Sequence, residues 1–276
     1  MKESVGMEQR MVFIGAGNMA EALVSGLLRR GLSKADRIRV TDIRAERCAY
    51  FRETYGVEGS DDNVSAARDA DMVVLAVKPQ GLQEVLQGLR SVLGARHLVI
   101  SIAAGVRVAD IEAALESGVR VVRAMPNTPA LVGRGVAAIC PGTHAADADL
   151  DLAEQVLGAT GLVVRVTESQ MDAVTAVSGS GPAYVFYLME AMQQAAQDLG
   201  LDEALAIRLI TGTVEGAARL VAETGRTPAE LRGQVTSKGG TTAAALSVMD
   251  DAAVREHLVA AVHAAQRRAR ELSSET

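Results

Sequence analysis

The sequence predicts an α/β protein in two parts: a doubly wound, mostly parallel sheet in residues 1–167 and an all-helical half in residues 168–276. Two observations carry this prediction. Short apolar strands alternate with helical patterns up to about Val166, which is typical of parallel βαβ units. From about Glu168 onward the strand signal disappears and only helical patterns remain. Residues 1–10 are polar, so we interpret them as an N-terminal extension and not as a signal peptide.

The first predicted strand, residues 11–14, is wholly apolar and runs directly into Gly15-Ala16-Gly17 and then a helix. This strand–turn–helix order is the context that a dinucleotide-binding fingerprint requires. Gly15 would allow the tight turn, and Gly17 would let a pyrophosphate approach the backbone at the helix N-terminus. Ala20 stands at the third glycine position, a variant that the fingerprint tolerates. A glycine-rich turn without a ligand is the alternative.

Asp42 ends the second predicted strand, residues 37–41. An acidic side chain at this place normally binds the ribose hydroxyls of NAD and repels the 2′-phosphate of NADP. Arg44 and Arg47 could instead attract that phosphate. The residues therefore favour NADH while leaving NADPH open, and a helix N-cap is the alternative role for Asp42.

The next predicted strands, residues 72–77, 97–101 and 119–124, also end in segments suited to ligand binding. Lys78-Pro79 follows the first of them, although Lys78 could equally be a solvated loop lysine. Ala103-Ala104 follows the second, and such small residues would let a nicotinamide lie close to the backbone. Asn127 and Thr128 lie between two prolines in a rigid turn, for which turn chemistry alone is a sufficient explanation.

The second half predicts helices over residues 183–199, 203–222 and 252–272, preceded by a small-residue loop at residues 178–182. These helices are rich in Ala, Leu and Val, and we expect them to bury against a second subunit. An ordinary intramolecular bundle is the alternative. Residues 234–242 are rich in Gly, Ser and Thr and precede a further helix, so they form a candidate site for a small carboxylate. A phosphate cradle or a capped turn fits the same residues.

Composition excludes several other classes of protein. The net charge of −6 argues against a nucleic-acid partner, and the longest apolar run, residues 98–106, is too short to span a membrane. Four scattered histidines predict no metal site, and two cysteines without a paired motif suggest a reducing compartment. We therefore expect a cytoplasmic protein.

Several blocks together resemble one family, the pyrroline-5-carboxylate reductases. The strongest match lies in the second half, where the chain fits the family's signature at Pro228, Leu231, Val235, Thr236, Ser237, Gly239, Gly240, Thr242, Ala245, Leu246, Met249 and Asp250. The blocks GAGNMA, AVKP, AAGV, NTP and DAVTAVSGSGPAY are similar to the family's other blocks and stand in the same order. The resemblance covers nearly the whole chain from Met11.

This resemblance implies a Rossmann domain followed by a helical domain that interlocks with a neighbouring subunit. It implies a homodimer, with either the dimer alone or a larger ring of dimers such as a decamer as the complete assembly. The implied reaction is NADH- or NADPH-dependent reduction of the cyclic imine 1-pyrroline-5-carboxylate to L-proline, the last step of proline biosynthesis. Family members that favour NADPH often carry a small hydroxyl or amide residue where Asp42 stands, which leaves the cofactor preference open.

Carried over position by position, the resemblance implies two sets of binding residues. The cofactor-binding residues are Gly15, Ala16, Gly17, Asn18, Met19, Asp42, Arg44, Asn63, Ala76, Val77, Lys78, Pro79, Ala103 and Ala104. The substrate-binding residues are Glu168, Ser178, Gly239, Gly240, Thr241 and Thr242. We expect the Thr242 hydroxyl to lie near the ring nitrogen, where it would hydrogen-bond or relay a proton. Glu168 would place negative charge near an iminium, or it is a surface residue of a turn at 167–170.

Two other functions fit parts of the sequence. A hydroxyacid-type dehydrogenase pairs a similar nucleotide domain with helices but normally carries a catalytic lysine on one of them. From residue 168 onward the chain has a single lysine, Lys238, and it lies in the Gly-Thr loop. A non-catalytic nucleotide sensor would be expected to have lost some of the ligand loops, and here all of them are present.

Overall fold

The structure, a computed structural model, describes residues 7–274. The chain divides into two compact units, Met1–Ser180 with Ala265–Thr276, and Gly181–Ala264. Residues 168–180, which the sequence assigns to the helical half, belong to the first unit in this division.

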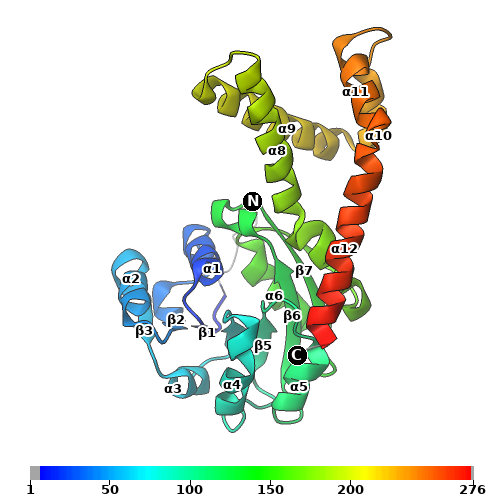
Figure 1. Ribbon diagram of the computed structural model, residues 1–276. Coiled ribbons are helices and arrows are strands. Elements are labelled where there is room, and N and C mark those ends of the chain that lie inside the picture. The colour runs from blue at the N-terminus through cyan, green and yellow to red at the C-terminus, as the bar shows by residue number, and fades with distance from the viewer. Residues whose placement is uncertain (1–6, 275–276) are drawn as a thin grey trace. The chain divides into compact units, whose positions relative to one another are not determined.

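The first unit is built on one sheet in the order β3-β2-β1-β4-β5-β6-β7-β8 (Figure 1). The strands are β1 (Met11–Ile14), β2 (Ile38–Thr41), β3 (Glu58–Ser60), β4 (Met72–Leu75), β5 (Leu98–Ser101), β6 (Arg120–Pro126), β7 (Gly135–Pro141) and β8 (Gly161–Arg165). All neighbouring strands are parallel except β6 and β7. The prediction of a doubly wound, mostly parallel sheet is therefore confirmed.

Helices cover both faces of this sheet, which is why its central strands are apolar throughout. The helices of this unit are α1 (Asn18–Arg29), α2 (Ala45–Tyr55), α3 (Asn63–Arg68), α4 (Pro79–Leu89), α5 (Val108–Ala114), α6 (Asp147–Gly158) and α7 (Met171–Val174). Phe13 and its same-face neighbours pack with α1, α2 and α6. Val12 and Ile14 face the other way, into a core shared with α3, α4, α5 and Met171. Alternate strand residues thus supply two separate cores.

Close packing of α1 places one glycine where no larger residue fits. A Cβ atom built on Gly26, in the last turn of α1, would lie 2.7 Å from the Ala159 carbonyl oxygen. The helix therefore approaches the segment after α6 closely, and this contact fixes the position of the helix whose N-terminus follows the glycine loop.

The predicted loop at residues 178–182 is wrong. Residues Thr175–Gly179 form a single turn of π-helix, and α8 (Gly181–Asp198) begins two residues later. The Ser180 N–H donates to the Thr175 carbonyl at 2.8 Å, five residues back, which is the hydrogen bond that defines the wider turn. Small residues there indicated a loop from sequence, but they also allow a helical turn to pack closely against β6, where Gly179 meets Met125.

The second unit is helical. It comprises α8, α9 (Glu203–Thr224), α10 (Pro228–Gln234), α11 (Thr241–Asp251) and the larger part of α12 (Val254–Ser274). The Asp202 side chain accepts the Leu205 N–H at the start of α9, and Thr227 and Glu230 form a capping box at the start of α10. Four of these helices, α8, α9, α11 and α12, were predicted within a few residues of their ends, α11 as a helical run over residues 243–249, whereas the short α10 was not foreseen.

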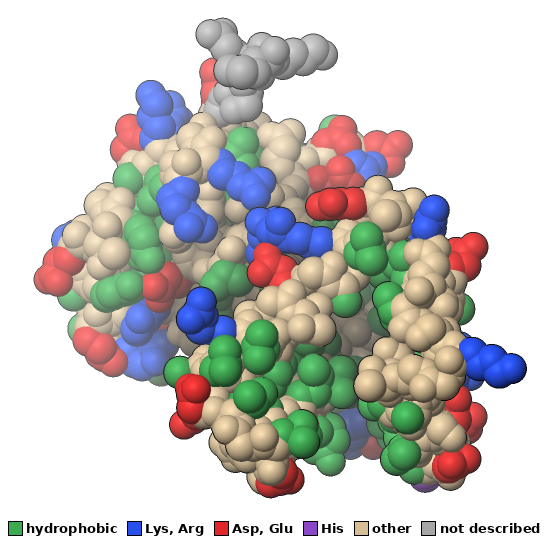
Figure 2. Space-filling view, turned by 90° about the horizontal axis from the view of Figure 1, so that it is seen from above, with side chains coloured by type: hydrophobic (Ala, Val, Ile, Leu, Met, Phe, Trp, Pro, Cys, Tyr) green, Lys and Arg blue, Asp and Glu red, His purple; other side chains and the backbone are tan. Residues whose placement is uncertain are grey.

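Much of the apolar surface of this unit remains exposed in the single chain. Its buried core is small and centres on Ala196, Ala206 and Ile210. Figure 2 shows hydrophobic side chains, in green, gathered over its helices. The large exposed ones include Phe186, Tyr187, Leu188, Ile207, Leu209, Val248, Leu258 and Val259. Exposed apolar area of this extent is characteristic of a protein–protein interface. Among the described helices, none has the length and hydropathy needed to cross a membrane.

Candidate cofactor and substrate site

The glycine-rich turn after β1 has the geometry that the fingerprint demands. Gly15 has a φ of +97°, and a Cβ atom there would lie 2.7 Å from the Ala76 carbonyl oxygen. Gly17, by contrast, has no atom within 4 Å of a built Cβ, so its outer side is open. Gly17 is also the N-cap of α1, and no side chain caps that helix. Gly15 thus packs the turn against β4, while Gly17 leaves backbone N–H groups accessible to an anion.

Asp42 closes this turn from the neighbouring strand. Its carboxylate accepts the Ala16 N–H at 2.9 Å and is bound by Arg44 through the backbone N–H and both Nε and Nη2. Burial alone would raise the pKa of Asp42, but the hydrogen bonds from Arg44 and Ala16 outweigh it and hold the pKa below its usual value. The helix N-cap role for Asp42 is wrong, because α2 begins at Ala45 with Arg44 as its N-cap.

The two nearby arginines have different roles. The Arg47 guanidinium donates to the Ala16 carbonyl and to Glu21, both at 2.7 Å, and lies over the ring of Tyr50 at 4.9 Å. The Arg47 guanidinium is therefore engaged in stabilising the glycine turn. Arg44 remains 52% exposed beside an 8%-exposed Asp42 carboxylate. Of these two arginines, Arg44 is the one available to a ligand at the end of β2.

The other predicted cofactor residues lie at the same edge of the sheet. Asn63 opens α3 directly after β3, and Lys78 is the N-cap of α4 with Pro79 as its first residue. Ala76 and Val77 link β4 to Lys78, and Ala103 and Ala104 follow β5. In this sheet the chain moves outward from β1 to β3 and then returns to β4 on the other side of β1. Such a switch point, at the carboxyl ends of the strands, is where open α/β sheets bind nucleotides.

Asn127 ties the end of β6 to the π-turn. Its Nδ2 donates to the Ser178 carbonyl at 3.0 Å, and its Oδ1 accepts the Val136 N–H at 2.8 Å. These bonds account for the buried amide without a ligand. The Ser178 Oγ, in contrast, is enclosed and has no hydrogen-bond partner among the described residues. A buried hydroxyl of that kind is an anomaly that a ligand could relieve.

Glu168 is held by the sheet and is not a free surface residue. Its Oε1 accepts from Arg123 Nη1 at 2.5 Å and from the Val108 N–H at 3.3 Å, and its Oε2 accepts from the Cys140 thiol at 2.9 Å. Arg123 is only 3% exposed and Glu168 37%. Burial, reinforced by the Glu168 charge, raises the pKa of Cys140 and keeps it a thiol. Sequence reasoning missed Arg123, although a charged residue inside the apolar strand VVRAM was a signal.

The predicted carboxylate loop lies in the second unit. Gly239 has a φ of +72°, Gly240 is the N-cap of α11, and Thr241 is its first residue. No side chain caps this helix, and the Gly240 N–H donates to the Ser237 carbonyl at 3.1 Å. Thr242 is half-buried on the first turn. The arrangement is the helix N-terminus that the sequence predicted.

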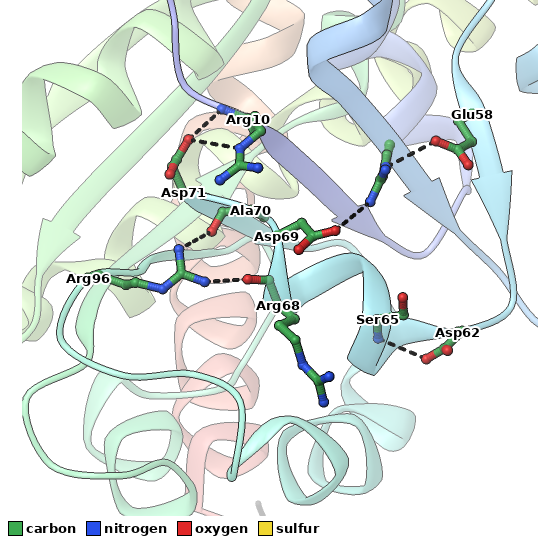
Figure 3. Close-up of polar contacts among 10 residues, drawn as sticks. Arg10, Glu58, Asp62, Ser65, Arg68, Asp69, Ala70, Asp71 and Arg96 are labelled. Atoms are coloured by element: carbon green, nitrogen blue, oxygen red, sulfur yellow. Dashed lines mark hydrogen bonds and ion pairs between the residues drawn. The ribbon is translucent and has the colours of Figure 1, made fainter.

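A pocket of about 80 Å³ lies at the opposite edge of the sheet and is lined by Arg10, Arg39 and Asp69 among others. Figure 3 shows polar contacts in and around this pocket: Arg10 pairs with Asp71 beside it, and away from it Asp62 caps α3 through the Ser65 N–H. Arg39 lies between Glu58 and Asp69, at 3.0 and 3.4 Å. These arginines are already neutralised, and the pocket is far from the strand ends that carry the loops. It is a structural charge cluster.

The chain matches two family models. The model described as "Pyrroline-5-carboxylate reductase dimerisation" covers residues 168–272, and the one described as "NADP oxidoreductase coenzyme F420-dependent" covers residues 10–105. The first supports the assignment of the helical half to subunit association. The second covers the glycine turn and the strand ends through β5.

Whole-chain relatives agree with these matches. A pyrroline-5-carboxylate reductase of Methanosarcina acetivorans is 41% identical over 96% of this chain and 98% of its own length. One of Pseudomonas aeruginosa is 42% identical over 96% and 97%.

Solved structures give the same result. The Coxiella burnetii pyrroline-5-carboxylate reductase has a TM-score of 0.91 at 42% identity, covering 97% of this chain and 99% of that one. The Plasmodium falciparum enzyme, solved with NADP bound, has a TM-score of 0.88 at 27% identity, covering 97% and 99%. With fold, loops and relatives in agreement over nearly the full length, the chain belongs to the pyrroline-5-carboxylate reductase family.

Proposed function

We propose that the protein reduces the C=N bond of 1-pyrroline-5-carboxylate with NADH or NADPH and so forms L-proline in the last step of proline biosynthesis. Family membership over nearly the whole chain supports the reaction. The observation that carries it in this structure is the turn at Gly15–Gly17, which combines a close approach to β4 with an open, uncapped helix N-terminus.

The residues at the strand ends fit a dinucleotide. The turn from Gly15 to Met19 would hold the pyrophosphate through the N–H groups of Gly17, Asn18 and Met19, because those of Gly15 and Ala16 are donated to Thr41 and Asp42. Asp42 with Arg44 would meet the adenosine ribose. Residues 76–79, Asn63 and Ala103-Ala104 would line the rest of the cofactor. When bound, the reduced nicotinamide supplies a hydride to the imine carbon.

Asp42 and Arg44 would together decide the preference for NADH or NADPH. The Asp42 carboxylate favours a ribose with free hydroxyls. Its partner Arg44 is exposed and can turn outward toward a 2′-phosphate, and the Asp42 carboxylate then keeps its bonds from the Ala16 and Arg44 backbone N–H groups. The pair is therefore compatible with both cofactors, with NADH expected to be favoured while Arg44 stays on Asp42.

The loop at Gly239–Thr242 would bind the substrate carboxylate through the N–H groups that open α11. Thr242 would place its hydroxyl near the ring nitrogen and hold or deliver the proton there. A protonated imine is already electrophilic, so positioning is the main task of the protein. The unpaired Ser178 hydroxyl is the second group that we assign to substrate binding, with Glu168 acting beside it.

The helical half supports association into a homo-oligomer, in agreement with the dimerisation family model. We propose that the basic unit is a homodimer through the exposed apolar helices, and that dimers assemble into a larger ring such as a decamer. Sedimentation velocity of the purified chain measures this directly. Its predicted cytoplasmic location stays a prediction.

Initial rates with pyrroline-5-carboxylate test the proposed reaction, with NADH and NADPH measured side by side and proline quantified as the product. Proline formation is the expected result, and a higher kcat/KM with NADH would support the assigned role of Asp42. Folded protein that binds nucleotide but turns over no imine would overturn the proposal in favour of a nucleotide sensor.

A further inference from the structure

One face of β6 touches a single segment of chain at three successive positions. Arg123 and Met125 alternate along β6, and Asn127 follows the last strand residue in extended backbone at the same spacing, so the three residues share a face. Arg123 Nη1 bonds Glu168 Oε1 at 2.5 Å, and Asn127 Nδ2 bonds the Ser178 carbonyl at 3.0 Å. The strand residue between these two, Met125, packs against Gly179: a Cβ atom built on Gly179 would lie 2.6 Å from the Met125 methyl group. The strand thus contacts both ends of residues 168–179.

The lengths of the two segments match. Four residues of strand from 123 to 127 extend about 13 Å at about 3.3 Å per residue. Ten residues of helix from 168 to 178 extend about 15 Å at about 1.5 Å per residue. Residues 168–179 form a nearly continuous helical run, namely η3 (Glu168–Gln170), α7 and the π-turn. Fixing its first residue therefore fixes where Ser178 lies along β6.

The ion pair between Arg123 and Glu168 is unusual because its arginine is buried. Arg123 is 3% exposed within an apolar core, its Nε has no hydrogen-bond partner among the described residues, and Glu168 is the carboxylate that neutralises it. A buried guanidinium strongly restricts where its carboxylate partner can sit. Cys140, directly opposite Arg123 in the sheet, and the Val108 N–H bind the same carboxylate and hold it in place.

We propose that Arg123 and Glu168 are positioning residues for the substrate: the pair sets the register of residues 168–178 along β6 and so fixes the position of the Ser178 hydroxyl, to which the proposed function gives a role in substrate binding. This inference rests on the proposed function and deepens it. Glu168 acts through the π-turn, since its two carboxylate oxygens are already engaged by the sheet and α5. Ser178 Oγ is the group so positioned, and within residues 7–274 this enclosed hydroxyl has no hydrogen-bond partner.

The test replaces the pair without leaving a buried charge. Arg123→Met combined with Glu168→Gln removes both charges: Gln keeps the length of Glu, and Met keeps the unbranched apolar stem of Arg, a type of exchange that often preserves stability. Glu168→Asp keeps the charge but withdraws the carboxylate by one methylene. The matched control is Arg90→Met with Glu116→Gln, an exposed pair at 3.4 Å in the same unit.

We expect both the double variant and Glu168→Asp to lose about ten-fold or more in kcat/KM for the imine, with the Kd for the cofactor changed by less than about two-fold. The control pair should match the wild type. Ser178→Ala should cost much less in the double variant than in the wild type, because residues that act as a unit are not additive. A kcat/KM within about two-fold of wild type in both variants would overturn the inference, as would full additivity with Ser178→Ala.

A second measurement does not depend on turnover. The Ser180 N–H that closes the π-turn should exchange with solvent faster in Glu168→Asp than in the wild type and the control, while amides of β1 stay equally protected. Equal exchange at residues 175–180 would refute the positioning role even if every variant lost activity. If the wild type itself reduced no imine, the proposed function would fail, and the exchange result would still decide whether the pair sets the turn. The charge-conserving Glu168→Asp carries the test if the double variant does not fold.

Discussion

Alanine substitutions at Gly15 and Gly17 should separate the two duties of the glycine turn. At Gly15 the new Cβ would meet the Ala76 carbonyl oxygen at 2.7 Å, and its φ of +97° disfavours any L-residue. The left-handed conformation alone costs about 1–2 kcal/mol, and the displacement of β4 adds to it. We expect Gly15→Ala to lower the free energy of unfolding by about 2–4 kcal/mol, in the range of strained backbone positions and overpacked sites.

At Gly17 the same methyl group meets no atom within 4 Å, and the φ of −78° suits any residue. Only the N-cap preference changes, which costs about 0.5–1 kcal/mol. The methyl group would, however, occupy the space through which a pyrophosphate reaches the backbone. We expect Gly17→Ala to fold nearly normally and to weaken cofactor binding by about ten-fold or more, or about 1.4 kcal/mol.

Urea unfolding followed by circular dichroism measures the first effect, and fluorescence titration with NADH and NADPH measures the second. The wild type is the reference for both, and each variant serves as the control for the other. If Gly15→Ala unfolded at the wild-type urea concentration, the close approach to β4 would be wrong. If Gly17→Ala bound both cofactors with wild-type Kd, the pyrophosphate would have to lie elsewhere.

Three further predictions concern the cofactor, the substrate and pH. Arg44→Ala should raise the KM for NADPH several-fold and leave the KM for NADH nearly unchanged, because only NADPH carries a 2′-phosphate. Equal changes in both KM values would show that Arg44 does not set the preference between the two cofactors. Thr242→Ala should lower kcat/KM for the imine by about 1–3 kcal/mol, the range for one hydrogen bond in a closed site, whereas Thr213→Ala, a substitution on the surface of α9, should not. Burial, with Arg96 nearby, lowers the pKa of His97 below 6.5 in the folded protein, so the unfolded chain takes up the proton first. The free energy of unfolding should therefore fall as the pH drops below about 6.5, and His97→Gln should flatten that slope between pH 7 and 5.

The sequence already contained the elements whose signals are local. Residues 11–14 are apolar and precede two glycines, so strand, turn and helix could be read in one stretch. The same holds for the strand ends near Lys78 and Ala103, because parallel strands must bring their carboxyl ends to one edge. Adjacent residues in the chain determine these features, and the periodicity of side chains reveals them.

Tertiary structure decided which polar groups meet. Asp42 was expected to face a ribose or cap a helix, but it also closes the glycine turn through the Ala16 N–H, 26 residues away in the chain. From the sequence, Arg47 was a candidate phosphate ligand. In the structure its guanidinium is hydrogen-bonded to Ala16 and Glu21 and so stabilises the glycine turn instead. Each pairing depends on how neighbouring strands lie in register, which no local pattern encodes.

The π-turn and the Arg123–Glu168 pair show most clearly which features local sequence determines and which depend on tertiary contacts. Composition at residues 178–182 indicated a loop, because small residues permit both a loop and a close-packed helical turn, and only the packing against Met125 selects the latter. The sequence by itself determined that Arg123 interrupts an apolar strand. That its charge is neutralised by Glu168, 45 residues later, was decided by the folded chain, since a buried cation requires a partner and the fold brings this carboxylate to it.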